Sequence, residues 1–313
     1  MSGSERGRWV WGAVALVLVG ALAGASAAMW GGDRGVIPRE VAAVERPMPT
    51  PTRTPTPTPT PTPIGAPADT TAYDLGTLPA VDVFAVLPAL PVDDDPFGAL
   101  TGLVAQPGAA GAPVFATEGG EPVARLAHEQ TYGGTVVPVI TRHDHWVRVL
   151  LVGRQGVPGS GDPRQVTGWM RAADVTLTAD PQRVEVDLSY RTIAIVTTPD
   201  ASADGSVAPE TSTLVATDFG SGAPGTPTPL GRAFLMFEDV VPQYAYTRGH
   251  PLVYLSVQSP TLAGFGGQPV AVTAFHYHDA RSGAISNGCI RLDAEAIAKL
   301  SLLPQGTGVR ILP

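Results

Sequence analysis

Cys289 is the residue whose type and neighbours point most directly to chemistry. It is the only cysteine among 313 residues, so it cannot form a disulfide within the chain. Two histidines, His276 and His278, lie a short way upstream. An imidazole near a thiol can take its proton and hold the thiolate, which is the reactive form. The alternative interpretation is that Cys289 is a small buried apolar residue without chemistry.

The neighbours of Cys289 can supply the other parts of a nucleophilic site. Gly288 frees the backbone before the cysteine, so its amide is expected to line an oxyanion hole. Arg291 offers a fixed cation for a carboxylate. His276 and His278 share one face of a strand, because side chains alternate with period two. Either histidine can therefore be the general base that serves the thiol.

Two segments resemble the catalytic domain of the L,D-transpeptidases, the YkuD-type family. That family carries an upstream His and then a Ser/Thr-His-Gly-Cys motif, followed by an apolar residue and Arg or Asn. The residues that match the motif are Ser286, Gly288, Cys289, Ile290 and Arg291. Residues 228–234, with the sequence TPLGRAF, resemble the family's Thr-Pro-x-Gly-x-Phe signature. Asn287 stands where the family has His, and the spacer after the upstream His is short.

The resemblance implies a mechanism. Cys289 would attack the amide after the third residue of a peptidoglycan stem tetrapeptide, and a second stem's amine would resolve the thioester. The family's base follows an apolar residue at the end of a strand, which assigns His276, with His278 as the alternative base or a substrate contact. Ser286 would orient the loop or contact the intermediate, and Asn287 can still donate and accept hydrogen bonds. Arg291 would bind a stem carboxylate or brace the turn through backbone carbonyls. Tyr246 lies in an aromatic segment that would line the substrate groove or serve packing. No cofactor or metal is expected.

Two rival functions remain open. One is an L,D-carboxypeptidase, which would give the same acyl group to water. The other is a non-catalytic wall-binding protein, favoured by Asn287 and by the short spacer. The net charge of −8 argues against a nucleic-acid partner. The expected partner is therefore the peptidoglycan stem peptide.

The N-terminus predicts export. Arg6 and Arg8 precede a stretch at 9–30 that carries no charge and is long enough to span a bilayer. Residues 1–30 are therefore a membrane anchor, or a signal peptide cleaved at an A-x-A-like site. Residues 31–71, rich in Pro and Thr, predict a disordered and extended linker. The remainder is expected outside the cytoplasm, in the cell wall, either membrane-anchored or secreted.

Two β-rich parts follow the linker. Residues 72–180 resemble a small SH3-like barrel, with strands expected at 113–116, 136–140 and 146–152 and a lead-in strand somewhere in 72–100. Residues 181–313 form the L,D-transpeptidase-type domain. Its expected strands are 184–188, 192–197, 214–217, 233–237, 270–276 and 307–312. A short helix is expected at 292–300, capped by Asp293, and its N-terminus is expected to favour the Cys289 thiolate. The predicted fold class is mainly β.

Overall fold

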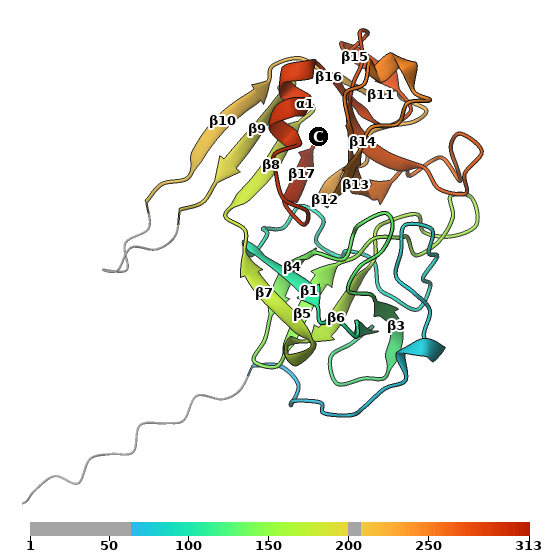
Figure 1. The fold of residues 1–313 in the computed structure, drawn as a ribbon, viewed down its shortest axis with the longest axis vertical. Coiled ribbons are helices and arrows are strands. Elements are labelled where there is room, and N and C mark those ends of the chain that lie inside the picture. Colours follow the sequence, from blue (N-terminus) through green and yellow to red (C-terminus); the bar gives the residue numbers. More distant parts are fainter. Residues whose placement is uncertain (1–63, 200–207) are drawn as a thin grey trace, which may run out of the picture. The chain divides into compact units, whose positions relative to one another are not determined.

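The computed structural model describes residues 64–199 and 208–313 (Figure 1). The expected membrane segment at 1–30 and most of the 31–71 linker lie outside the described residues. Among the residues described, the helices are too short or too polar to cross a membrane. Across 64–199 and 208–313 strands dominate, arranged in one sheet of seven and one of ten, and these ranges hold one short α-helix. The expectation of a mainly β fold with a short helix is confirmed.

The first sheet has the strand order β3-β2-β6-β5-β4-β1-β7. Its members are β1 (Leu103–Pro107), β2 (Ala112–Phe115), β3 (Pro122–Leu126), β4 (Val137–Arg142), β5 (Trp146–Leu150), β6 (Thr167–Arg171) and β7 (Val175–Ala179). The strands expected at 113–116, 136–140 and 146–152 are β2, β4 and β5. Phe115 and Trp146 are fully buried and meet edge to face, with ring centroids 5.0 Å apart. The SH3-like assignment of this part remains an interpretation.

The segment before β1 contributes to the core without forming the expected lead-in strand. It contains the 3₁₀ turn η1 (Leu75–Thr77) and isolated bridges at Ala80, Val86 and Val92. Val81 and Leu90 are buried beneath the first sheet. Contact with that sheet begins before residue 72, because the Trp146 Nε1–H donates to the Pro67 carbonyl at 3.0 Å.

The second sheet has the strand order β10-β9-β8-β17-β12-β13-β14-β16-β11-β15. Its members are β8 (Gln182–Asp187), β9 (Thr192–Thr197), β10 (Thr211–Ala216), β11 (Gly220–Gly222), β12 (Gly231–Asp239), β13 (Leu252–Gln258), β14 (Val272–Tyr277), β15 (Gly283–Ser286), β16 (Ile290–Leu292) and β17 (Gly308–Leu312). β8 and β9 form the hairpin that the alternating pattern predicts. β13, β11, β15 and β16 were not expected.

Helix α1 (Ala294–Leu300) lies against the second sheet (Figure 1). Asp293 caps it as expected, since its carboxylate accepts from the Ala296 N–H at 2.8 Å. Ile297 and Leu300 are fully buried among residues of the sheet, and α1 contacts β10, β13 and β14. Strand β16 separates Cys289 from α1, so the helix does not begin at the thiol. The expectation that its N-terminus favours the thiolate is therefore wrong in this fold.

A buried ion pair ties the signature segment 228–234 to the residues that precede β1. The Arg232 guanidinium binds both oxygens of Asp93, at 2.6 and 3.0 Å, and both side chains are buried. Arg232 also donates to the Ala99 carbonyl at 3.1 Å. Removing either charge would leave its partner buried and unpaired, which is strongly destabilising. Arg232 is therefore a structural residue of this signature.

Candidate active site

Strands β14 and β16 place the predicted catalytic residues on one face of the second sheet. They pair in parallel, with Phe275 opposite Ile290 and His276 opposite Arg291. Phe275 and Ile290 are fully buried in the core. Because side chains alternate, His276 and Arg291 lie on the opposite face. Cys289, two residues before Arg291, shares that face with His276.

The imidazole of His276 is held in one tautomer. Its Nδ1 lies 2.9 Å from the Tyr277 carbonyl oxygen. A carbonyl can only accept, so Nδ1 carries the hydrogen and Nε2 keeps its lone pair. The side chain is buried, and this burial lowers its pKa to about 4, with the nearby charges of Arg291 and His278 acting in the same direction. His276 is therefore neutral near pH 7, with Nε2 able to accept a proton.

His278 has the opposite tautomer. Its Nδ1 accepts the Ala280 N–H at 2.9 Å, so the neutral ring carries its hydrogen on Nε2. The two imidazole centroids are 6.2 Å apart, which agrees with the expected shared face. His278 can thus donate a hydrogen bond from Nε2, while its accepting nitrogen is already engaged. Of the two histidines, His276 has the tautomer that a base requires.

The turn before Cys289 is closed by Ser286. Its hydroxyl donates to the Cys289 carbonyl at 2.5 Å and accepts from the Gly288 N–H at 3.1 Å. Gly288 has φ of 111°, a conformation that side chains other than glycine's rarely adopt. The Gly288 amide therefore already has an acceptor in the Ser286 hydroxyl, and its role as an oxyanion donor stays a prediction. Ser286 is buried and holds the loop, while Asn287 is exposed.

Cys289 is a free cysteine, and the residue is half-buried. Burial by the surrounding protein raises its pKa, while the Ala274 backbone and the Arg291 charge oppose that change. The pKa of His276 is lowered at the same time, so the resting pair is a neutral thiol and a neutral imidazole. A neutral pair of this kind would suit proton transfer from the thiol to the imidazole during attack. The expectation of a thiolate held by the imidazole stays a prediction.

A neighbouring loop supports the catalytic turn. The Thr226 hydroxyl donates to the Ser286 carbonyl at 2.9 Å, and the Ala223 N–H donates to the same oxygen at 2.8 Å. Thr261 then ties this loop to the one that precedes β14, through the Gly225 carbonyl at 3.1 Å. The sequence analysis did not identify these contacts, because nothing local marks Thr226 as a partner of residue 286.

Tyr246 lies over the two histidines. It belongs to the 3₁₀ turn η3 (Ala245–Thr247), and its ring centroid lies 5.3 Å from His276 and 5.4 Å from His278. Tyr244 stacks on it at 5.4 Å. Burial raises the pKa of Tyr246 to about 12, and the electrostatic effect of Cys289 acts in the same direction. The predicted substrate residue Tyr246 is thus part of the same cluster.

Arg291 completes the cluster. Its Nη1 donates to the Ala280 carbonyl at 3.4 Å, while its buried Nε has no hydrogen-bond partner among the described residues. The guanidinium is therefore only weakly held by the protein. Elsewhere in the described ranges, no three His, Cys, Asp or Glu side chains gather as metal ligands would.

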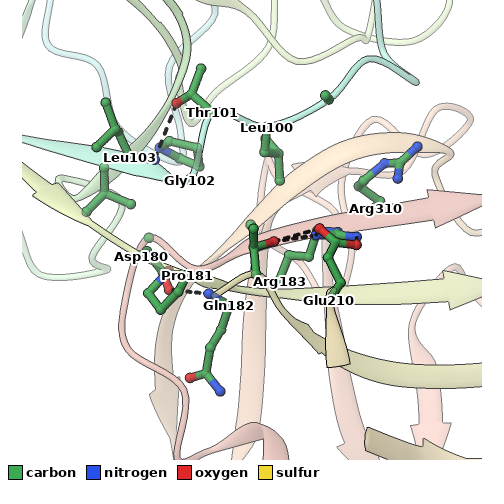
Figure 2. A pocket seen from close by; sticks show the side chains of 16 residues that line it. Leu100, Thr101, Gly102, Leu103, Asp180, Pro181, Gln182, Arg183, Glu210 and Arg310 are labelled. Carbon is green, nitrogen blue, oxygen red and sulfur yellow. Dashed lines mark hydrogen bonds and ion pairs between the residues drawn. The ribbon is translucent and has the colours of Figure 1, made fainter. Parts of the chain in front are cut away.

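Figure 2 shows a different cavity, of about 260 Å³, lined by residues of both sheets. Leu100 and Leu103 form part of its wall, and the Arg183 guanidinium binds the Glu210 carboxylate at 2.7 Å on another side. None of the predicted catalytic or substrate residues lines it. The cavity is thus separate from the cluster around Cys289.

No family model matches the chain, and no curated protein matches it. Solved structures do match. Among them are L,D-transpeptidases. The enzyme from Mycobacterium smegmatis is 13% identical, with 54% of this chain and 91% of that chain covered and a TM-score of 0.27.

Two further matching structures differ in how much of each chain is covered. An L,D-transpeptidase in complex with imipenem is 15% identical, with 66% of this chain and all of that chain (100%) covered and a TM-score of 0.31. The Ldtfm–avibactam carbamoyl enzyme is 21% identical, with 44% of this chain covered and a TM-score of 0.26. This chain spans 52% of that enzyme's length. The function proposed below depends on the geometry around Cys289.

Proposed function

We propose that this protein is a cell-wall L,D-transpeptidase that uses Cys289 as its nucleophile on peptidoglycan stem peptides. The observation that carries the proposal is the hydrogen bond from His276 Nδ1 to the Tyr277 carbonyl. It leaves the Nε2 lone pair on the face that Cys289 shares. The motif around Cys289 and the signature at 228–234 support the choice of reaction.

In the acylation step, Cys289 Sγ attacks the carbonyl carbon after the third stem residue, and its proton moves to His276 Nε2. The tetrahedral oxyanion needs hydrogen-bond donors. We assign this role to the Cys289 amide and to the Nε2–H of His278, because Ser286 occupies the Gly288 amide. His276 then gives its proton to the departing D-amino acid, and a thioester remains.

In the second step, the side-chain amine of another stem attacks the thioester carbon. His276 accepts a proton from that amine, and the collapse of the intermediate returns a protonated thiol and a new amide crosslink. Arg291 is assigned to a stem carboxylate, because the protein itself holds its guanidinium only weakly. Tyr246 and Asn287 are both exposed and are assigned to substrate contact near Cys289.

The proposal places the protein outside the cytoplasm, where its substrate lies. The N-terminal segment at 1–30, as an anchor or a signal peptide, and the Pro/Thr-rich linker remain predictions from the sequence. A linker of this composition would hold the catalytic part away from the membrane surface. Whether the segment is cleaved decides between a membrane-anchored and a secreted enzyme.

Carbapenems provide an active-site probe for this chemistry. Incubation with imipenem is expected to acylate Cys289 and to add one imipenem mass per chain, because a thiol served by a base opens the strained lactam as it would a stem amide. Intact-protein mass spectrometry measures the adduct, and Cys289→Ala is the control that should stay unmodified. No added mass after prolonged exposure would count against an active site.

A further inference from the structure

A second pocket lies beside strands β12 and β13. It has a volume of about 190 Å³ and is lined by Asp82, Val83, Phe84, Gln130, Thr131 and Tyr132. Phe84 and Tyr132 are 42% and 46% exposed, and their rings meet edge to face at 5.5 Å. Large aromatic side chains exposed together on a soluble protein often mark a binding site. The pocket suits a small ring rather than a drug-sized ligand.

The polar groups of this pocket suit hydroxyl groups. One Asp82 oxygen accepts the Phe84 N–H at 2.8 Å, which leaves the other oxygen to face a ligand. Gln130 donates from Nε2 to the Gly133 carbonyl at 2.7 Å and keeps its side-chain oxygen as an acceptor. Proteins bind a pyranose ring with polar groups that stand beside aromatic rings. Here the polar groups are the Asp82 carboxylate, the Gln130 amide oxygen and the Thr131 hydroxyl. The rings pack on its C–H face while the polar groups bind its hydroxyls.

Both walls of the pocket are fixed to the second sheet. The buried Gln258 of β13 donates to the Val83 carbonyl at 3.0 Å. On the other side, Gly133 packs so closely on β12 that a Cβ there would lie 2.3 Å from the Met236 carbonyl oxygen. Gly133 has φ of 62°, so glycine is needed there for both reasons. The pocket is therefore held in place and is not a chance gap between loops.

A row of side chains connects the pocket with the thiol. Tyr132 lies 5.9 Å from Phe237 between ring centroids, and Phe237 stacks on its strand partner Tyr254 at 4.5 Å. Tyr254 pairs with Ala274 on β14, and one step of the β14–β16 register places Ala274 opposite Cys289. At the usual spacing between strands, Cys289 lies about 15 Å from Phe237.

We infer that this pocket binds a sugar ring of the glycan strand that carries the donor stem peptide. The choice of polymer rests on the proposed function. The Tyr132 ring lies a further 5.9 Å beyond Phe237, so the pocket is about 20 Å from Cys289. In peptidoglycan the stem is attached to a sugar through a lactyl group, and three extended stem residues span about 10 Å. The lactyl group and the sugar ring itself would have to supply the remaining length for the amide after the third residue to reach Cys289. The glycan would then anchor the substrate while the stem lies along the row.

Isothermal titration of the full chain with chitotetraose, a β-1,4-linked tetramer of N-acetylglucosamine, tests this inference. Wild type is expected to bind, and Tyr132→Ala is expected to weaken binding about tenfold through loss of one stacking face. Phe84→Ala should act in the same direction. Tyr190→Ala removes an exposed aromatic outside the pocket and should leave binding unchanged. Thermal denaturation checks that each variant is folded.

Cys289→Ala separates this inference from the proposed function. It should bind chitotetraose as wild type does, while Tyr132→Ala should still form the imipenem adduct. Absence of sugar binding in an imipenem-reactive wild type would overturn the glycan site alone. Equal affinity of wild type and Tyr132→Ala for chitotetraose would also overturn the glycan site. So would displacement of chitotetraose by a stem peptide that carries no sugar. If wild type binds the sugar but does not react with imipenem, the glycan site is kept and the proposed transpeptidase activity is rejected.

Discussion

Cys289→Ala is expected to abolish crosslink formation, with a loss of roughly 10⁴-fold or more, because no other group can form the thioester. Cys289→Ser should be nearly as inactive, since a hydroxyl is much harder to ionise than a thiol. Product analysis with stem tetrapeptides measures the loss. The fold should persist, because Cys289 is small and half-buried and the turn is closed by the Ser286 hydroxyl, which bonds the backbone of Gly288 and Cys289.

Thermal denaturation of Cys289→Ala is the control for that result. An unfolding midpoint close to that of wild type would assign the loss to chemistry. Wild-type turnover in the folded Ala variant would show that Cys289 is the small buried apolar residue of the alternative interpretation.

His276→Ala should lower turnover by about 10²–10⁴, the usual contribution of a general base. The pH dependence gives a sharper test. The pKa of His276 is lowered to about 4 by burial, so it loses its ability to accept a proton only as the pH falls through that value. The acylation rate of wild type should therefore hold near neutral pH and fall in acid. We call the fall in rate near pH 4 the acid limb. In His276→Ala the acid limb and the level rate above it should both be lost. The rate should instead rise steadily with pH, because the thiol must then ionise without a base.

His278→Ala is the matched control for His276→Ala. It should keep the acid limb, because His278 Nδ1 is engaged by the Ala280 amide. Its loss should weaken oxyanion binding and substrate affinity instead. Rates of imipenem acylation across the pH range compare the two variants directly. If His278→Ala removes the acid limb and His276→Ala retains it, the two assignments are reversed.

Local patterns in the sequence predicted much of the second sheet. The alternation at 184–188 and 192–197 marks β8 and β9, because one face of this hairpin is buried. Asp293 before an apolar helical pattern marks the cap of α1. Val253, Leu255 and Val257 carry the same alternation in β13, and this signal was available in the sequence but was not used.

Other features depend on contacts that the sequence does not show. The short strands β11, β15 and β16 exist because they pair with distant strands, and three or four residues carry too little pattern to predict a strand. The parallel pairing of β14 and β16 places a strand between Cys289 and α1, which removes the expected helix effect. The tautomers of His276 and His278 follow from backbone partners, the Tyr277 carbonyl and the Ala280 amide, that no motif identifies.

The most direct test is intact-protein mass spectrometry of the full chain incubated with a stem tetrapeptide donor. Wild type should gain the mass of the tripeptide acyl group on Cys289, with release of the terminal D-residue, and an acceptor stem should convert this species into a crosslinked dimer. Accumulation of only a shortened monomer would contradict transfer and indicate the carboxypeptidase. Absence of both acyl-enzyme and product would contradict catalysis by Cys289 altogether.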